Sequence, residues 1–69
     1  MKQNKNLLIS FSNGVQCQGI MNLDFAITHV SKLFPDENTT VLIMEIGENN
    51  IYFPLYERTN GEWIDKSQL

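Results

Sequence analysis

Cysteine is almost absent from this chain, because Cys17 is the only one among 69 residues. A single thiol cannot form an internal disulfide, and it cannot build a cysteine-based zinc site within one chain. We therefore expect no bound metal. Chains without disulfides are typical of a reducing compartment, so the expected location is the cytoplasm.

Long apolar runs are missing as well. The start of the chain, MKQNKNLLIS, has a short apolar stretch behind two lysines. This stretch is too short for the core of a signal peptide, and no segment approaches the length of a membrane span. We expect no association with a membrane.

Positive charge is scarce, with five Lys and Arg against eight Asp and Glu and a net charge of −3. The imbalance lies in residues 35–69, where seven acids stand against only Arg58 and Lys66. An acidic surface repels phosphate, so direct binding of nucleic acid is disfavoured and a basic protein surface is the better partner. The alternative is a solvated face that only keeps the protein soluble.

Motifs with catalytic chemistry are also lacking. The glycines Gly14 and Gly61 stand in isolated Asn-Gly pairs, not in a phosphate-binding loop before a helix. A nucleophile and base formed by Cys17 and His29 would require hydrogen-bond contact, but we place Cys17 in the core and His29 on the wet side of a helix. Paired carboxylates would need a water-poor pocket, and none is indicated. We expect no enzyme and no cofactor.

The first structural signal is the stretch FSNGVQCQG, an Asn-Gly turn between two stretches of alternating polarity. Their period of two predicts strands over residues 6–12 and 15–21. A two-residue turn would set the apolar side of one strand against the polar side of the other. A three-residue turn with a left-handed Gly14 and a bulge pairs Phe11 with Val15 and gives one apolar face. We favour the bulged turn.

Apolar residues then recur at helical spacing from Leu23 to Phe34. Asn22 is a suitable N-cap, Asp24 suits the positive first turn, and Pro35 ends the helix. The pattern predicts an amphipathic helix of roughly three turns.

The second half predicts two longer strands, over residues 41–46 and 51–58, joined by the loop 47–50. The first of them is apolar on both sides apart from one glutamate, as a central strand should be. We expect the loop to set the even-numbered apolar residues of the first strand opposite the odd-numbered ones of the second: Ile46 with Ile51, Met44 with Phe53, and Leu42 with Leu55.

The last reversal, Thr59-Asn60-Gly61, resembles the first in its residues. A bulged turn here places Trp63 on the side of Phe53. A tight two-residue turn would instead place it on the other side, with Tyr56. We favour the bulged turn.

These elements give a single α+β domain over residues 1–69, with the order ββαβββ. The expected sheet is mostly antiparallel, has about five strands in the spatial order 2-1-3-4-5, and carries one helix on one face. Pro54 has no N–H, so it should lie where the fourth strand has no neighbour.

One helix covers only one face of such a sheet, and the uncovered face should then be unusually apolar. We expect it to carry Leu8, Ile20, Val41, Ile43, Tyr52, Pro54 and Tyr56. Aromatic residues and arginine are enriched where partners bind. The predicted partner-binding residues are therefore Tyr52, Tyr56, Val41, Ile43, Glu45 and Arg58.

The function that follows is a small non-catalytic protein-binding module, an inhibitor or modulator that occupies a surface of a larger, basic, nucleic-acid-handling protein. Small acidic proteins of phages or mobile elements that act on host defence or regulatory factors are analogous in size and charge. The alternative is a structural or regulatory subunit whose apolar sheet face forms a homodimer. A terminal segment folded over that face is a third possibility.

Overall fold

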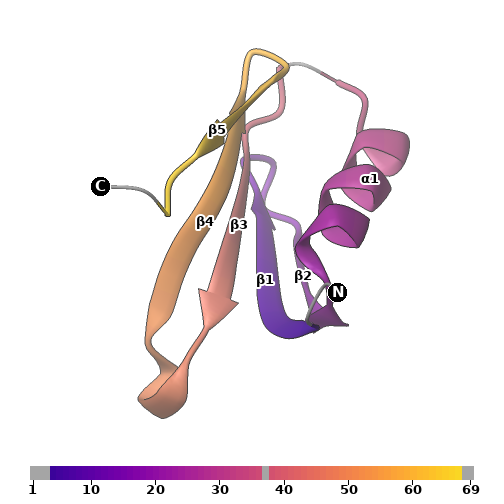
Figure 1. Cartoon of the computed structure of the whole chain (residues 1–69). Coiled ribbons are helices and arrows are strands. Elements are labelled where there is room, and N and C mark those ends of the chain that lie inside the picture. Colours follow the sequence, from indigo (N-terminus) through magenta and orange to yellow (C-terminus); the bar gives the residue numbers. More distant parts are fainter. Residues whose placement is uncertain (1–3, 37, 68–69) are drawn as a thin grey trace.

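The structure is a computed structural model and describes residues 4–36 and 38–67. Within these residues, five strands form one antiparallel sheet, and α1 lies against one of its faces (Figure 1). The strand order is β2-β1-β3-β4-β5, so the predicted α+β fold and order are confirmed. The elements are β1 (Lys5–Phe11), β2 (Gln16–Met21), α1 (Leu23–Leu33), β3 (Val41–Ile46), the 3₁₀-helix η1 (Glu48–Asn50), β4 (Tyr52–Thr59) and β5 (Glu62–Asp65).

The bulged turn between β1 and β2 is confirmed. Gly14 has a φ of 95°, in the left-handed region that favours glycine. The N–H of Phe11 donates to the carbonyl of Val15 at 2.9 Å, and the N–H of Gly14 donates back to Phe11 at 3.0 Å. Ile9 therefore lies opposite Cys17, as predicted.

Helix α1 has the predicted ends. The Asn22 side-chain oxygen accepts the N–H of Phe25 at 2.7 Å, which satisfies one of the free donors of the first turn. The helix is 11 residues long, and it ends at Leu33 before Pro35. In the described part of the chain, no helix is both long and apolar enough to cross a membrane.

Strand β3 presents the opposite side to the helix from the one we expected. The core consists of Leu7, Ile9, Phe11, Ala26, Val30, Val41 and Ile43. Because β3 is apolar on both sides, alternation alone does not select a register. Two hydrogen bonds fix it: Ser12 N–H donates to the Thr40 carbonyl at 2.9 Å, and Thr40 N–H donates to Ser12 Oγ at 3.0 Å. Phe11 then lies opposite Val41.

The loop between β3 and β4 is one residue longer than predicted, which makes the expected pairing wrong. Asn49 and Asn50 both adopt a positive φ, of 60° and 58°. The chain therefore returns later, and Ile46 lies opposite Tyr52, not opposite Ile51. A change of one residue in register reverses the side of the sheet that each residue faces.

A second irregularity interrupts the pairing of β3 with β4 between Ile43 and Met44. Met44 lies opposite Pro54, but Ile43 lies opposite Tyr56, so Leu55 is the extra residue of a bulge. Leu55 still packs against the core. The bulge explains why strict alternation along β4 did not predict which of its residues face the helix.

The turn between β4 and β5 is tight, so the bulged turn predicted there is wrong. Asn60 and Gly61 have φ values of 54° and 81°, the pair of positive angles that a two-residue type I′ turn requires. Thr59 lies opposite Glu62, and Trp63 lies opposite Arg58. Trp63 packs against the core on the helix side.

Strand β5 covers only the end of β4, which confirms the expected position of Pro54. Its pairing runs from Thr59 with Glu62 to Tyr56 with Asp65. Pro54 lies outside this stretch, where β4 has no neighbour on that side. A residue without an N–H is tolerated at such an edge.

Candidate functional site

The six residues predicted to bind a partner do not share one face. Val41 and Ile43 are both 0% exposed and belong to the core, so their assignment to the uncovered face is wrong. The shifted register described above is the reason. Tyr52 does lie on the uncovered face, opposite Ile46, and half of it is exposed.

Arg58 is buried on the helix side, and its placement on the uncovered face is also wrong. One of its Nη atoms donates to the carbonyl of Asp36 at 3.0 Å and to that of Thr39 at 3.4 Å. The guanidinium lies 5.9 Å from the ring centre of Trp63. Its Nε atom has no acceptor among the described residues. Arg58 thus holds the connection between α1 and β3 against the sheet.

Tyr56 and Glu45 also face the helix side. Tyr56 lies opposite the buried Ile43 and is half-buried. Glu45 lies opposite Leu7 and accepts a hydrogen bond from Lys5 Nζ at 3.3 Å, in a partly exposed ion pair. Of the predicted set, only Tyr52 is therefore left on the uncovered face.

The uncovered face is largely apolar, as expected, but its members differ. The register places Leu8, Ile20, Leu42, Met44, Ile46, Tyr52, Pro54 and Ile64 on it. Glu57 also faces this side, where Lys66 Nζ lies 3.6 Å from its carboxylate. A 2.7 Å hydrogen bond from Thr59 Oγ1, helped by Lys66, holds the pKa of Glu57 below its usual value.

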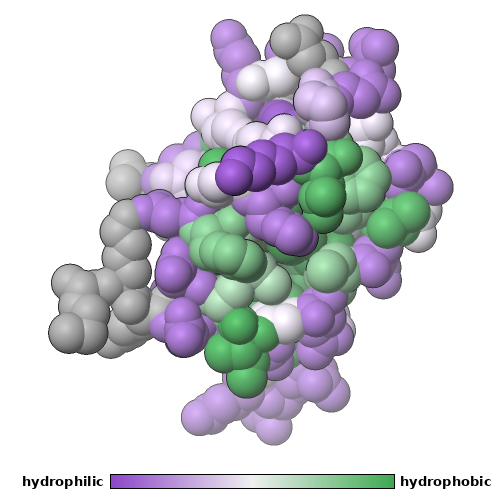
Figure 2. Space-filling view, turned by 90° about the vertical axis from the view of Figure 1, so that its right-hand side faces the viewer, coloured by the Kyte–Doolittle hydropathy of each residue, from purple (hydrophilic) through white to green (hydrophobic). Residues whose placement is uncertain are grey.

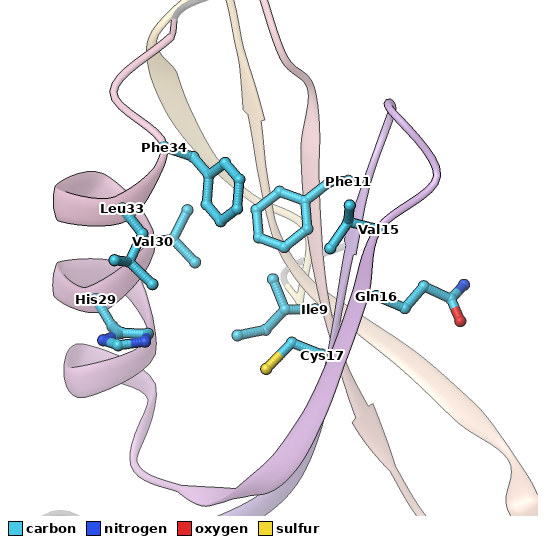
Figure 3. A pocket seen from close by; sticks show the side chains of 9 residues that line it. All are labelled: Ile9, Phe11, Val15, Gln16, Cys17, His29, Val30, Leu33 and Phe34. Carbon is cyan, nitrogen blue, oxygen red and sulfur yellow. The ribbon is translucent and has the colours of Figure 1, made fainter.

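The helix side carries a feature that the sequence analysis did not foresee, an apolar groove of about 290 Å³ between α1 and β2. Figure 2 views the molecule from this side and shows a broad apolar area in its middle, bordered above and below by hydrophilic residues. The groove is lined by Ile9, Phe11, Val15, Gln16, Cys17, His29, Val30, Leu33 and Phe34. Most of these side chains point into the space between helix and sheet, whereas that of Gln16 points away (Figure 3).

The wall of the groove belongs partly to β2, which is an edge strand of the sheet. The backbone N–H of Phe11 donates a hydrogen bond to the carbonyl of Val15. In an antiparallel pair of strands, hydrogen-bonded residue pairs alternate with non-hydrogen-bonded pairs. Gln18 lies opposite Leu8 in a non-bonded pair, so its N–H and C=O point away from β1. The groove therefore runs along a row of backbone groups that pair with no other strand among the described residues.

Cys17 and His29 line this groove together, which corrects the assignment of Cys17 to the core, whereas His29 is exposed as expected. Cys17 is exposed, not buried. Among the described residues, no hydrogen bond joins the two side chains, and the ring of His29 stacks on Phe25 at 5.5 Å. The residues that the structure describes also contain no group of three His, Cys, Asp or Glu that could hold a metal ion. Activation of a nucleophile needs a base in hydrogen-bond reach, and the described residues show no such contact between Cys17 and His29.

The charge around the groove differs from that of the whole chain. The residues lining the groove include no acid. Phe25, His29 and Lys32 recur at helical spacing and are exposed along the outer edge of α1. The acidic residues belong mostly to β3, β4 and β5 and the loops between them.

Sequence reasoning missed the groove because it treated the apolar side of β2 as fully covered by the helix. Val15 is 45% exposed and Leu33 is 58% exposed. The sequence contained two signals of this gap. A single helix of 11 residues cannot cover a sheet of five strands, and the apolar residue Phe25 lies outside the buried stripe of the helix. No protein-family model, curated protein or solved structure matches this chain.

Proposed function

We propose that this protein is a non-catalytic binding module that acts in the cytoplasm by occupying a surface of a larger protein. The observation that carries the proposal is the apolar groove between α1 and β2, which leaves Val15, Phe25 and Leu33 about half exposed. Exposed apolar surface of this kind, bordered by polar groups, is typical of sites where another protein binds.

The role proposed is that of an inhibitor or modulator. A chain of 69 residues with a net charge of −3 can cover part of a partner's surface but offers little room for an enclosed active site. The acidic half formed by β3, β4 and β5 suits a partner with a basic surface nearby, such as a nucleic-acid-handling protein. A phage or mobile-element protein that blocks a host defence or regulatory factor would have this form.

The test compares two exposed positions on opposite faces. Wild type, Leu33→Asp and Tyr52→Asp are each immobilised and exposed to a lysate of the source cells. A captured protein is then purified, and its binding to each variant is measured with the mass and stoichiometry of the complex. The proposal expects a defined complex with wild type and Tyr52→Asp, and loss of binding in Leu33→Asp, because Leu33 lines the groove and is 58% exposed. Equal binding by all three proteins would contradict it.

Self-association through the uncovered sheet face is the second candidate. It is supported by the row of apolar side chains on that face, with Tyr52 50% and Ile64 43% exposed. In a homodimer, the mass in solution doubles with concentration, and Tyr52→Asp returns it to that of one chain. A wild type that stays monomeric at high concentration excludes this alternative.

A further inference from the structure

We infer that the groove binds an extended, acidic and apolar segment of the partner, which pairs with β2 as a sixth strand of the sheet. The inference rests on the proposed function and adds the chemistry of the segment. It joins three features of one place: a strand edge that pairs with no described strand, an apolar groove beside it, and Lys32 on the outer rim of the groove.

The free edge determines that the occupant is a strand. By the alternation of the β1–β2 ladder, the backbone groups of Gln16, Gln18 and Ile20 point away from β1. β2 is the last strand on its side of the sheet in the described part of the chain. An extended peptide satisfies such a row of donors and acceptors, whereas a small apolar ligand in the groove would leave it unpaired.

The groove determines the spacing of the apolar residues. Side chains of neighbouring strands that lie directly opposite share one face of the sheet. Residues of the added strand opposite Val15 and Cys17 therefore point to the helix side, toward Leu33 and His29 on the other wall (Figure 3). These two residues are two positions apart, so the segment carries an apolar pair of the form apolar-x-apolar.

The residues at the rim of the groove determine the charge expected of the partner segment. His29 and Lys32 stand on the exposed edge of α1, and none of the residues that line the groove is acidic. An acidic side chain next to the apolar pair complements Lys32 and adds specificity. The basic surface proposed for the partner faces the acidic β3–β5 half, on another part of the molecule.

A second copy of this chain is a poorer occupant. Pairing of β2 with β2 about a twofold axis would bring two α1 helices side by side. Lys32 of one copy would then approach Lys32 of the other, and like charges in contact oppose association. Lys32 therefore favours a partner segment of opposite charge.

The test uses random short peptides displayed on phage, selected against the immobilised wild-type protein. We expect enriched peptides to share the apolar-x-apolar pair with a neighbouring Asp or Glu. Bound to the protein, they should slow hydrogen exchange at the amides of Gln16, Gln18 and Ile20. The amides of Cys17 and Gly19, already bonded to β1, should change little.

A matched pair of variants tests the strand pairing itself. Gln18→Pro removes an outward N–H without removing a bond to β1, and proline is tolerated at an edge. It should weaken the enriched peptides by about tenfold or more, the scale of one or two lost hydrogen bonds. Gln18→Thr keeps the N–H and suits a strand, so it should bind like wild type. Lys32→Glu should weaken binding of the acidic peptides and spare neutral ones.

Several results would overturn the inference. No enrichment, or equal binding by Gln18→Pro and Gln18→Thr, overturns the inference. Protection of the Gln18 amide in the free monomer would mean that this chain covers its own edge, and protection that rises with protein concentration would mean a second copy. If no peptide is enriched but the purified partner still binds wild type and not Leu33→Asp, the proposed function stands and only this inference fails.

Discussion

Arg58 lies over Trp63, with 5.9 Å between the guanidinium carbon and the centre of the ring. The two residues are direct neighbours across β4 and β5, and Trp63 in turn packs against the core. Arg58 is only 4% exposed and donates to backbone carbonyls of the connection between α1 and β3. The last hairpin, the core and this connection therefore meet at one arginine.

Replacing Arg58 by lysine should destabilise the fold. Lysine lacks the planar fork that reaches Asp36 and Thr39 while lying over Trp63. We expect a loss of about 1–3 kcal/mol in the free energy of unfolding, measured in urea. Lys66→Ala, which removes an exposed cation, is the control and should change stability by less than about 0.5 kcal/mol. Equal effects of the two changes would show that the buried contacts of Arg58 contribute little.

The register of β3 can be tested at two adjacent residues. Val41 is 0% exposed, whereas Leu42 faces the uncovered side of the sheet and is half-buried. Val41→Thr introduces a hydroxyl into the core and should cost about 1–3 kcal/mol. Leu42→Thr should cost less than about 1 kcal/mol, since the hydroxyl remains near water. A larger loss in Leu42→Thr would contradict the register.

Local patterns predicted the elements of this fold well. The bulge at Gly14, the Asn22 cap and the stop before Pro35 depend on residues close together in the sequence. The strand order followed from these elements and from the position of Pro54. Each of these features was confirmed.

Which face β3 presents to the helix could not be read from the alternation of its residues. Its apolar residues occupy both sides, so the choice depends on Ser12 and Thr40, which come from separate parts of the chain. The left-handed Asn49 and Asn50 then lengthen the next loop, and the bulge at Leu55 shifts β4 again. All six residues of the predicted site lie on these two strands, so the shifts moved five of them off the uncovered face.

The type of the turn between β4 and β5 can be tested at its two central residues. Gly61 has a φ of 81°, a conformation that costs an L-residue with a side chain about 1–2 kcal/mol. Gly61→Ala should lower the free energy of unfolding by that amount. Asn60 has a φ of 54°, so Asn60→Gly should leave stability nearly unchanged or raise it slightly. Thermal unfolding of both variants checks the turn type. In a bulged turn Gly61 would also be left-handed but Asn60 would not, so a clear loss of stability in Asn60→Gly would contradict the tight turn.

Glu57 predicts a dependence of stability on pH. Its pKa in the folded protein lies below the ordinary value of 4.5, chiefly because Thr59 donates a hydrogen bond to it. A lowered pKa contributes stability that is complete above the unfolded pKa and is lost as the pH falls through the folded pKa. Thr59→Val should therefore destabilise the protein near neutral pH but not in strong acid. Urea unfolding at both pH values tests this.

Glu57→Gln is the control for this effect. It removes the titrating group, so the variant should lose all of the pH dependence that Glu57 contributes, which includes the part that Thr59→Val removes. A Thr59→Val effect that stays constant down to strong acid would show that the hydroxyl acts through packing and not through the carboxylate.

Pro54 and the short strand β5 make the two edges of the sheet unequal in their capacity to pair with another strand. On the border formed by β4 and β5, proline supplies no N–H, and β5 is only 4 residues long and carries Glu62 and Asp65. Short, charged or proline-bearing borders resist further pairing. An added strand would therefore pair more readily with β2 than with the edge formed by β4 and β5. If a partner strand pairs with β2 as proposed, these features of the opposite edge disfavour the addition of a further strand there and oppose the linking of molecules edge to edge.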